Sequence, residues 1–338
     1  MIEEHVAAEV EALRRVTDLV ERVAGDTRTT RVLRVHAGDL ANELGRVRTW
    51  RSLENLREAA GKLRAEALSY TQGVLLREHR LDDGAGPAVD ALVTHLCAAA
   101  DVAPDVVIGV NTGSESYTRT LDLVRLPPHC DVWHLPVVAH ELGHYVIREL
   151  RHAQDKDARP LRELVETIGD DDHAEELVAD SYATFTIGPA YPLSCLWLRI
   201  DPGTAARAGV THPSWQRRVH VMVSLLTLMS AEYDTGQYSG AVETMLLPAW
   251  KQLTGQDATT PGEGDNPART ILTQLNRHLG HSRYVVGSNV TLAARALKDR
   301  TPMPQGVTPA HVLNAAWQAR LRGDLDPDFN RRALEAMR

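Results

Sequence analysis

Two histidines four residues apart, inside a strongly apolar stretch, place the tightest constraint on how this chain can fold. The stretch contains His140-Glu141-Leu142-Gly143-His144, and apolar residues flank it on both sides. Four residues make about one turn of an α-helix, so both imidazoles lie on the same face of a helix. The apolar flanks bury that helix, and a buried imidazole needs partners for its ring nitrogens. The pattern therefore predicts a buried helix over about 135–150 whose histidines share a metal ion.

A metal site of this kind needs a third protein ligand, and an acidic helix further along the chain offers one. Glu176 stands 32 residues after His144 and four residues before Asp180, so the two carboxylates share a helix face. Glu176 can bind the metal while Asp180 accepts a hydrogen bond from the outer nitrogen of a ligand histidine. Carboxylates near a helix N-terminus also complement the helix dipole. Glu175 and His173 therefore remain open as alternatives for the third ligand.

Three protein ligands with one open position are typical of catalytic Zn²⁺ sites. Glu141 lies between the two histidines and is not needed as a ligand. We therefore expect it to act as the general base that takes a proton from a water molecule at the zinc. We expect His212 to donate a hydrogen bond to the oxyanion, although residues 211–214 (THPS) could simply begin a helix with proline in its first turn. Weaker candidates for the same donor are Tyr182, Tyr284 and His220.

These segments together resemble the gluzincin zinc metallopeptidases. The first segment is VVAHELGHYV, the second is EELVADSYA, and the third is THPS followed by Arg217 and Arg218. Within the gluzincins, the combination looks most like the lineage of the membrane heat-shock protease HtpX and the CAAX prenyl proteases. The resemblance spans about residues 105–220, roughly a third of the chain.

The resemblance implies a zincin-like core that hydrolyses peptide bonds. It also implies that an extended peptide substrate pairs with the strand expected over Tyr117–Leu126. Unlike that lineage, this chain contains no uncharged apolar run near the roughly 20 residues that span a bilayer. By resemblance, the zinc ligands are His140, His144 and Glu176, the general base is Glu141, and the partner of a ligand histidine is Asp180.

The spacing of apolar residues predicts an α+β fold that is mostly α-helical, with a small β-sheet. Val6, Val10, Leu13, Val16 and Val20 recur at helical steps, and Gly25-Asp26 interrupts them. A second helical stretch follows over about 31–70, with Gly61 as the place where it could break. A helix over about 88–100 precedes short β-type runs at Val106–Val110 and Tyr117–Leu126.

This pattern divides the chain into three expected regions. We expect a helical N-terminal region over 1–80, a zincin-like core over 88–220, and a helical C-terminal region over 221–338 packed on the core. The N-terminal helices could pack as a hairpin on the rest of the protein or form an arm that binds a protein partner.

Composition narrows the class of protein. The net charge of −8 argues against nucleic-acid binding, because proteins that bind phosphates usually carry a basic excess. The acidic, amphipathic start is unlike a signal peptide, and the three dispersed cysteines form no CxxC pair, so we expect a cytoplasmic protein with no membrane span.

The sequence thus predicts a cytoplasmic, zinc-dependent metalloprotease that acts on a peptide or protein substrate. Two alternatives remain open. One is a zinc hydrolase of a non-peptide or isopeptide amide, and the other is a zincin-fold binding module without enzymatic activity. The presence of Glu141 argues against the second alternative, because a purely structural metal site has no use for a general base.

Overall fold

Apolar residues at three- and four-residue steps produce helices along most of this chain. The computed structural model divides into two compact units, Met1–Gly86 with Asp105–His129 and Pro87–Pro104 with Cys130–Arg338. Among the described residues, no helix is both long enough and apolar enough to cross a bilayer. The described residues are 2–79, 81, 85–103, 107–110, 116–118, 121, 123–127, 130–152, 155, 157–169, 172–233, 237–255 and 267–338.

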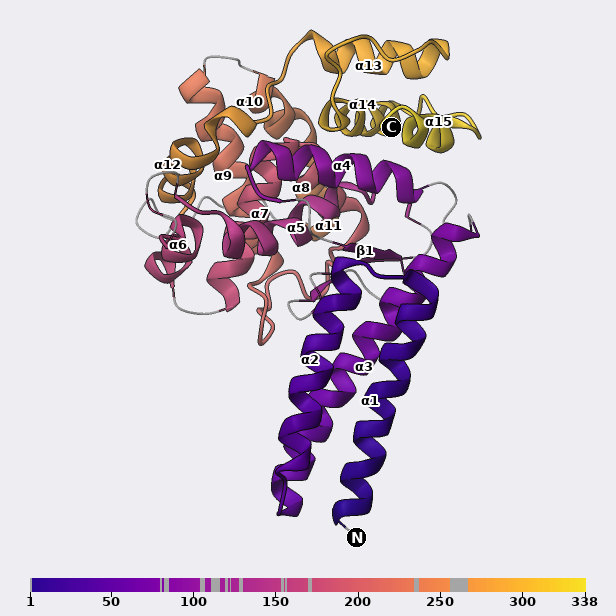
Figure 1. The fold of residues 1–338 in the computed structure, drawn as a ribbon. Helices are drawn as coiled ribbons and strands as arrows, with labels where there is room; N and C mark the ends of the chain where they lie inside the picture. The colour runs from indigo at the N-terminus through magenta and orange to yellow at the C-terminus, as the bar shows by residue number, and fades with distance from the viewer. Residues whose placement is uncertain are drawn as a thin grey trace. The chain divides into compact units, whose positions relative to one another are not determined.

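Three long helices form most of the first unit. They are α1 (Ile2–Ala24), α2 (Arg28–Gly45) and α3 (Trp50–Glu78), and each packs along the other two (Figure 1). The apolar stripe predicted for the first helix is confirmed, because its central members are buried and its first members pack against the same core. The buried core of the bundle includes Leu13, Val16, Val20, Leu33, Leu44, Leu53, Leu63 and Tyr70.

Local backbone signals set the ends of these helices. Gly25 follows α1 with a φ of 69°, a left-handed conformation that glycine adopts without a steric penalty. The break expected near Gly61 is wrong, because Gly61 lies inside α3. The helical stretch is instead interrupted between Gly45, where α2 ends, and Trp50, where α3 begins. Thr49 has an extended backbone and caps α3, because its side-chain oxygen accepts a hydrogen bond from Ser52 N at 3.3 Å.

The small sheet also belongs to the first unit. Strand β1 (Val107–Val110) pairs in parallel with β3 (Leu123–Leu126), and β2 (Ser116–Thr118) pairs antiparallel with β3, so the order is β1-β3-β2. The single strand expected over Tyr117–Leu126 is therefore two strands of a hairpin. Alternation of polar and apolar residues did not reveal the turn between them.

The division into units differs from the regions expected from sequence. The predicted core of 88–220 included the sheet, whereas the structure groups the sheet with the N-terminal helices. The physical reason is packing: Leu121 and Leu123 are buried in the same apolar cluster as the helical bundle. Residues 130–220 and 221–338 lie in one unit.

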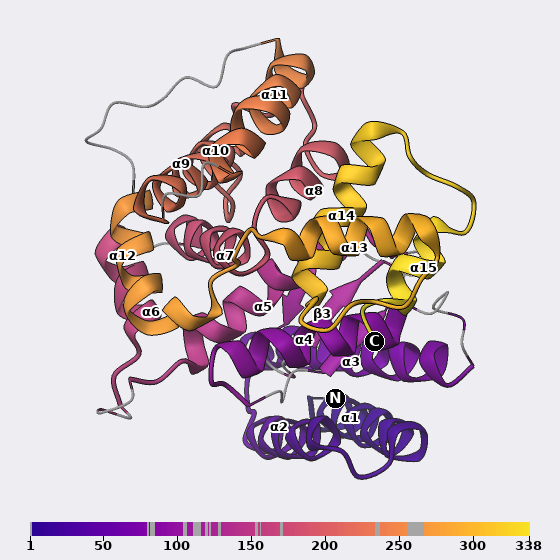
Figure 2. The same ribbon diagram turned by 90° about the horizontal axis from the view of Figure 1, so that it is seen from above.

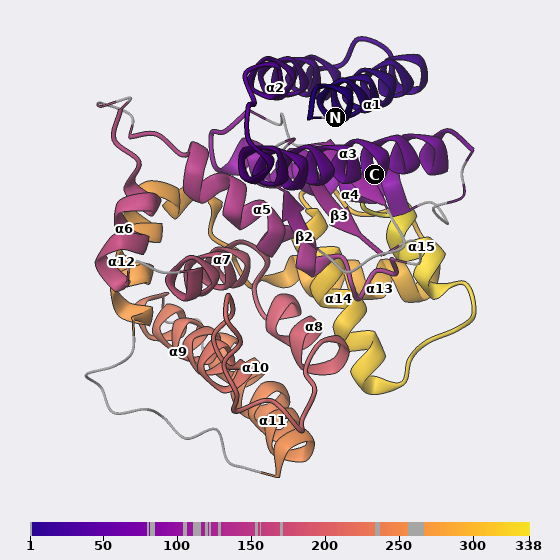
Figure 3. The same ribbon diagram turned by 90° about the horizontal axis from the view of Figure 1, so that it is seen from below.

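A buried helix organises the second unit. Helix α7 (Asp172–Ile187) is buried along nearly its whole length and packs against helices on several sides, and Figures 2 and 3 show it between α5 (Pro136–Glu149) and α9 (Trp215–Tyr233). The other helices are α4 (Ala85–Ala99), α6 (Pro160–Ile168), α8 (Ala190–Leu198), α10 (Gln237–Ala241), the π-helical turn Val242–Leu246, α11 (Leu247–Thr254), α12 (Ala268–Leu279), the 3₁₀ turn Gly280–Ser282, α13 (Ser288–Asp299), α14 (Pro309–Arg322) and α15 (Phe329–Glu335).

A partly buried ion pair in the helical bundle gives a first prediction. Glu9 of α1 accepts hydrogen bonds from Arg57 at 3.0 Å and Arg64 at 2.6 Å, both on α3. Burial acts to raise the pKa of Glu9, but the two arginines outweigh it and hold the pKa below its usual value. This pairing stabilises the bundle above the unfolded-state pKa of about 4.3, and the stabilisation is lost as the pH falls through the folded-state pKa.

We expect Glu9→Gln to lower the free energy of unfolding of the bundle by about 0.5–1 kcal/mol at pH 7. The difference from wild type should shrink as the pH falls below 4, and hydrogen exchange of α1 amides at both pH values measures it. Glu54→Gln, at an exposed position of α3, serves as the control and should change little. An equal destabilisation at both pH values would contradict the ion-pair explanation.

Candidate metal centre

Helix α5 presents the predicted motif. Pro136 occupies its first turn, where a missing N–H costs nothing, and the apolar residues that follow are buried. His140, Glu141 and His144 offer ligand atoms that all lie within 4.8 Å of one another. His140 and Glu141 are buried, and His144 is nearly so. This cluster could hold a metal ion.

A close crossing brings α7 against α5 at this motif. A Cβ atom on Gly143 would lie 3.1 Å from the Cα and 3.2 Å from the Cβ of Ala179, closer than ordinary van der Waals contact. The absence of a side chain at Gly143 therefore lets the two backbones approach. The acidic face of α7 is placed directly against the two imidazoles as a result.

Glu176 of α7 contacts both histidines through different carboxylate oxygens. Its Oε2 lies 3.4 Å from His140 Nε2, and its Oε1 lies 3.4 Å from His144 Nε2. Glu176 is almost fully buried, and its Oε2 has no hydrogen-bond partner among the described residues. A buried carboxylate thus faces the inner nitrogens of both rings.

The outer ring nitrogens have carboxylate partners of their own. His140 Nδ1 lies 2.9 Å from Asp180 Oδ1, although the oxygen is out of line for a full hydrogen bond. His144 Nδ1 lies 3.0 Å from Glu175 Oε1 and is hydrogen-bonded to it. Each histidine therefore turns its Nε2 atom toward Glu176 and its Nδ1 atom toward another carboxylate.

A buried arginine compensates the charge of Asp180. Arg218 of α9 donates two hydrogen bonds of 2.7 Å to the two oxygens of Asp180, and its NH2 lies 3.4 Å from Glu176 Oε2. Tyr191 of α8 donates a third, at 2.5 Å, and its ring stacks on His140 with centroids 5.8 Å apart. The Arg218 guanidinium also lies over the Trp215 ring at 4.3 Å. This network holds α7, α8 and α9 together behind the motif.

The electrostatics of the cluster favour a bound positive charge. Burial lowers the pKa of His140, but Asp180 and Glu176 outweigh it and leave the pKa raised. Burial likewise opposes protonation of His144, yet Glu175 and Glu176 raise its pKa to about 10. Burial acts to raise the pKa of Glu176, whereas the histidines and Arg218 hold it well below its usual range. Glu176 and Asp180 are therefore ionised, and their negative charges stabilise a positive charge beside them.

The predicted His212 lies beside the same carboxylate. Its Nε2 is 3.5 Å from Glu176 Oε1, and its side chain is 56% exposed, so it stands at the open side of the cluster. His212 sits in the coil before α9 rather than inside a helix, since α9 begins at Trp215. His173, an alternative ligand, instead makes a 3.1 Å hydrogen bond with the Gly209 carbonyl.

The weaker sequence candidates lie elsewhere. The Tyr182 hydroxyl faces the Leu96 carbonyl at 3.5 Å, and His220 lies 3.4 Å from the Ser224 hydroxyl. Tyr284 lines a different cavity. The sequence did not indicate a role for Tyr191, and it assigned no role to Arg218 beyond its place near the THPS segment. In the sequence, Tyr191 stands in an otherwise apolar stretch, and that was its one signal.

Comparison of the chain with protein-family models, with curated proteins and with solved structures found no match.

The buried Arg218 gives a second prediction. Replacing Arg218 with methionine keeps much of the packing volume but leaves Asp180 buried without its main countercharge. We expect a loss of about 3–5 kcal/mol in the free energy of unfolding, measured by urea denaturation. Arg217→Met is the matched control, because Arg217 is the exposed neighbour on the same helix and should change stability by less than about 0.5 kcal/mol. Similar small losses in both variants would show that the ion pair is not structurally important.

Proposed function

We propose that this chain is a zinc-dependent metallopeptidase in which His140, His144 and Glu176 bind the metal and Glu141 is the general base. One observation carries the proposal: the inner nitrogens of both motif histidines face the two oxygens of one buried carboxylate at 3.4 Å. The resemblance of the three sequence segments to gluzincins supports the same assignment.

The spacing of these atoms fits a metal better than a hydrogen bond. A distance of 3.4 Å is long for a hydrogen bond between a ring nitrogen and a carboxylate. In a tetrahedral zinc site with bonds of about 2.0–2.1 Å, neighbouring ligand atoms lie about 3.3–3.4 Å apart. The buried Oε2 of Glu176 makes no hydrogen bond among the described residues, and a bound cation would satisfy it.

Glu176 is favoured over the two alternative ligands. The Glu175 carboxylate already accepts from His144 Nδ1 at 3.0 Å and lies 3.6 Å from Arg162. His173 is hydrogen-bonded to a backbone carbonyl. Nitrogen and oxygen donors in this combination are typical of zinc, with the outer nitrogens of the ligand histidines held by carboxylates.

The residues of the site then take distinct chemical roles. A bound zinc ion would polarise the scissile carbonyl and lower the pKa of a water molecule. Glu141, buried beside the two histidines, takes the proton of the attacking water and passes it to the leaving amine. His212, at the exposed side, donates a hydrogen bond to the oxygen that gains negative charge. Asp180 and Glu175 keep the ligand rings oriented.

Metal binding gives the third prediction. The purified chain should bind about one zinc ion in a competition titration with a chelating dye, because three ligands define one site. Glu176→Ala should remove most of this affinity. Glu175→Ala should weaken it by only about ten- to a hundredfold, since Glu175 acts through His144. If Glu175→Ala loses more affinity than Glu176→Ala, the third ligand is misassigned.

The role of Glu141 gives the fourth prediction. Glu141→Gln should keep its zinc and its thermal stability, because its side chain is not a ligand in this arrangement. The amide cannot accept a proton, so peptide hydrolysis should slow by at least about a hundredfold. Digestion of a peptide library by wild type and by this variant measures the effect and reveals the cleavage preference.

The same experiment separates the alternative functions. Cleavage of amides other than main-chain peptide bonds, again lost in Glu141→Gln, would identify a non-peptide or isopeptide hydrolase. Identical behaviour of both proteins in every cleavage assay would contradict the catalytic proposal and leave a binding module.

A further inference from the structure

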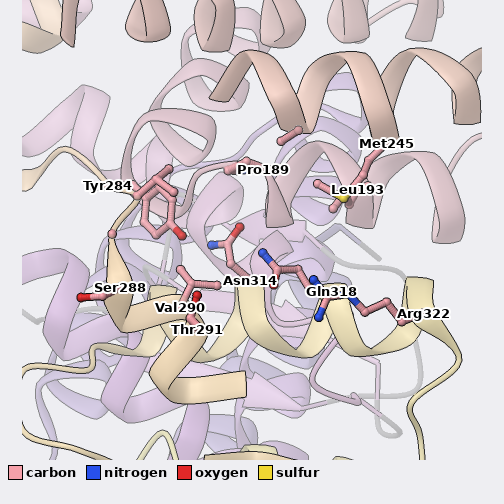
Figure 4. Close-up of a pocket in the computed structure, with 13 residues that line it drawn as sticks. Pro189, Leu193, Met245, Tyr284, Ser288, Val290, Thr291, Asn314, Gln318 and Arg322 are labelled. Atoms are coloured by element: carbon pink, nitrogen blue, oxygen red, sulfur yellow. The ribbon is translucent and has the colours of Figure 1, made fainter. Parts of the chain in front are cut away.

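A cavity lies in the unit that carries the candidate metal centre, among residues that the proposed reaction does not use. It has a volume of about 610 Å³ and lies among α8, the π-helical turn, α13 and α14 (Figure 4). This volume is within the range of sites that hold small molecules, about 300–1,000 Å³. One wall is apolar and includes Leu193, Met245 and Val290.

A buried tyrosine presents a hydroxyl to this cavity. The side chain of Tyr284 is only 4% exposed, and its ring lies flat against Gly188, where a Cβ would come within 2.2 Å of the ring. Gly188 has a φ of 77°, so both its backbone and its lack of a side chain suit this packing. Figure 4 shows the hydroxyl pointing into the cavity. The hydrogen bonds of Tyr284 to other described residues are made by its backbone: its N–H donates to the Phe185 carbonyl, and its carbonyl accepts from the Tyr238 hydroxyl.

The cavity lining also contains one positively charged side chain, Arg322. Arg322, an exposed residue at the last position of α14, is the only charged residue among the described residues that line it, and its guanidinium extends from the solvent side toward the cavity beside Gln318 (Figure 4). No carboxylate of the described chain lies within ion-pair distance of Arg322. A cation without an acidic partner favours an anionic ligand.

The first turn of α13 adds further donors. Ser288 and Thr291 line the cavity, and Gly287, the residue before the helix, provides no side-chain cap. The first N–H groups of a helix lack partners within the helix, and the helix dipole favours an anion there. The hydroxyl of Tyr284, whose ring is buried and which points into the same cavity, is an independent donor there.

We propose that this cavity binds a small organic oxyanion with an apolar body. The carboxylate or phosphate group contacts Arg322, Tyr284 and the first turn of α13. The apolar body packs against Leu193 and Met245. The proposal does not depend on the metal centre, because none of these residues contacts the motif histidines in the structure.

Isothermal titration of the full chain with octanoate, monooctyl phosphate and octanol tests this proposal. We expect at least one of the two anions to bind saturably and at least about tenfold more tightly than octanol, which has the same apolar body without the charge. Tighter binding of octanoate would identify a carboxylate site, and tighter binding of monooctyl phosphate a phosphate site. Absence of saturable binding by both anions, or equal binding of octanol, would overturn the proposal.

Single substitutions locate the binding site. Arg322→Gln should weaken anion binding about tenfold or more and leave octanol binding unchanged, because only the positive charge is removed. Tyr284→Phe should weaken anion binding severalfold, because it removes the hydroxyl and keeps the ring on Gly188. Arg295→Gln, at an exposed arginine of α13 outside the cavity, is the matched control and should bind like wild type. Circular dichroism confirms that each variant is folded. Wild-type affinity in the folded Arg322 variant would overturn the proposal.

Discussion

Where α5 crosses α7, Ala179 leaves no space for a side chain at Gly143, and the candidate metal centre depends on that close approach. The two histidines come from one helix and the opposing carboxylates from the other. A separation larger by one methyl group would move Glu176 out of reach of the imidazole nitrogens, since ligand bonds tolerate only a few tenths of an ångström. Tight packing of small residues is thus a condition for the chemistry as well as for the fold.

The candidate metal centre also requires that the charges of its buried carboxylates be compensated. Four carboxylates near the motif would be strongly destabilised by burial if each lacked a partner. The structure gives Asp180 the planar guanidinium of Arg218, gives Glu175 the outer nitrogen of His144, and leaves Glu176 facing the inner nitrogens of both rings. Such networks are stable when each member is satisfied. Within this network, the buried Oε2 of Glu176 has no hydrogen bond among the described residues, and it faces His140 Nε2, where the metal is expected.

Local sequence patterns predicted the helices well because their causes are local. The stripe in α1, the turn at Gly25 and the motif helix follow from spacing over a few residues. The pairing of Arg218 with Asp180 joins residues 38 positions apart, and no short pattern reveals it. The same is true of the packing of Leu123 with the N-terminal helices, which changed the expected boundaries. The antiparallel pairing of β2 with β3 was also not predicted, because the alternation of polar and apolar residues does not show where one strand ends and the next begins.

Behind the motif, side chains of α7, α8 and α9 bind directly to one another through Asp180, Tyr191 and Arg218. Arg218, Tyr191 and Asp180 would keep these helices in register whether or not a metal is bound. This arrangement differs from a small zinc finger, in which the ion itself drives folding. In this chain, a metal at the proposed site would bind between helices that Asp180, Tyr191 and Arg218 already connect. Exchange of that metal would then leave the helices in place, and occupancy of the site would follow the supply of metal around the protein.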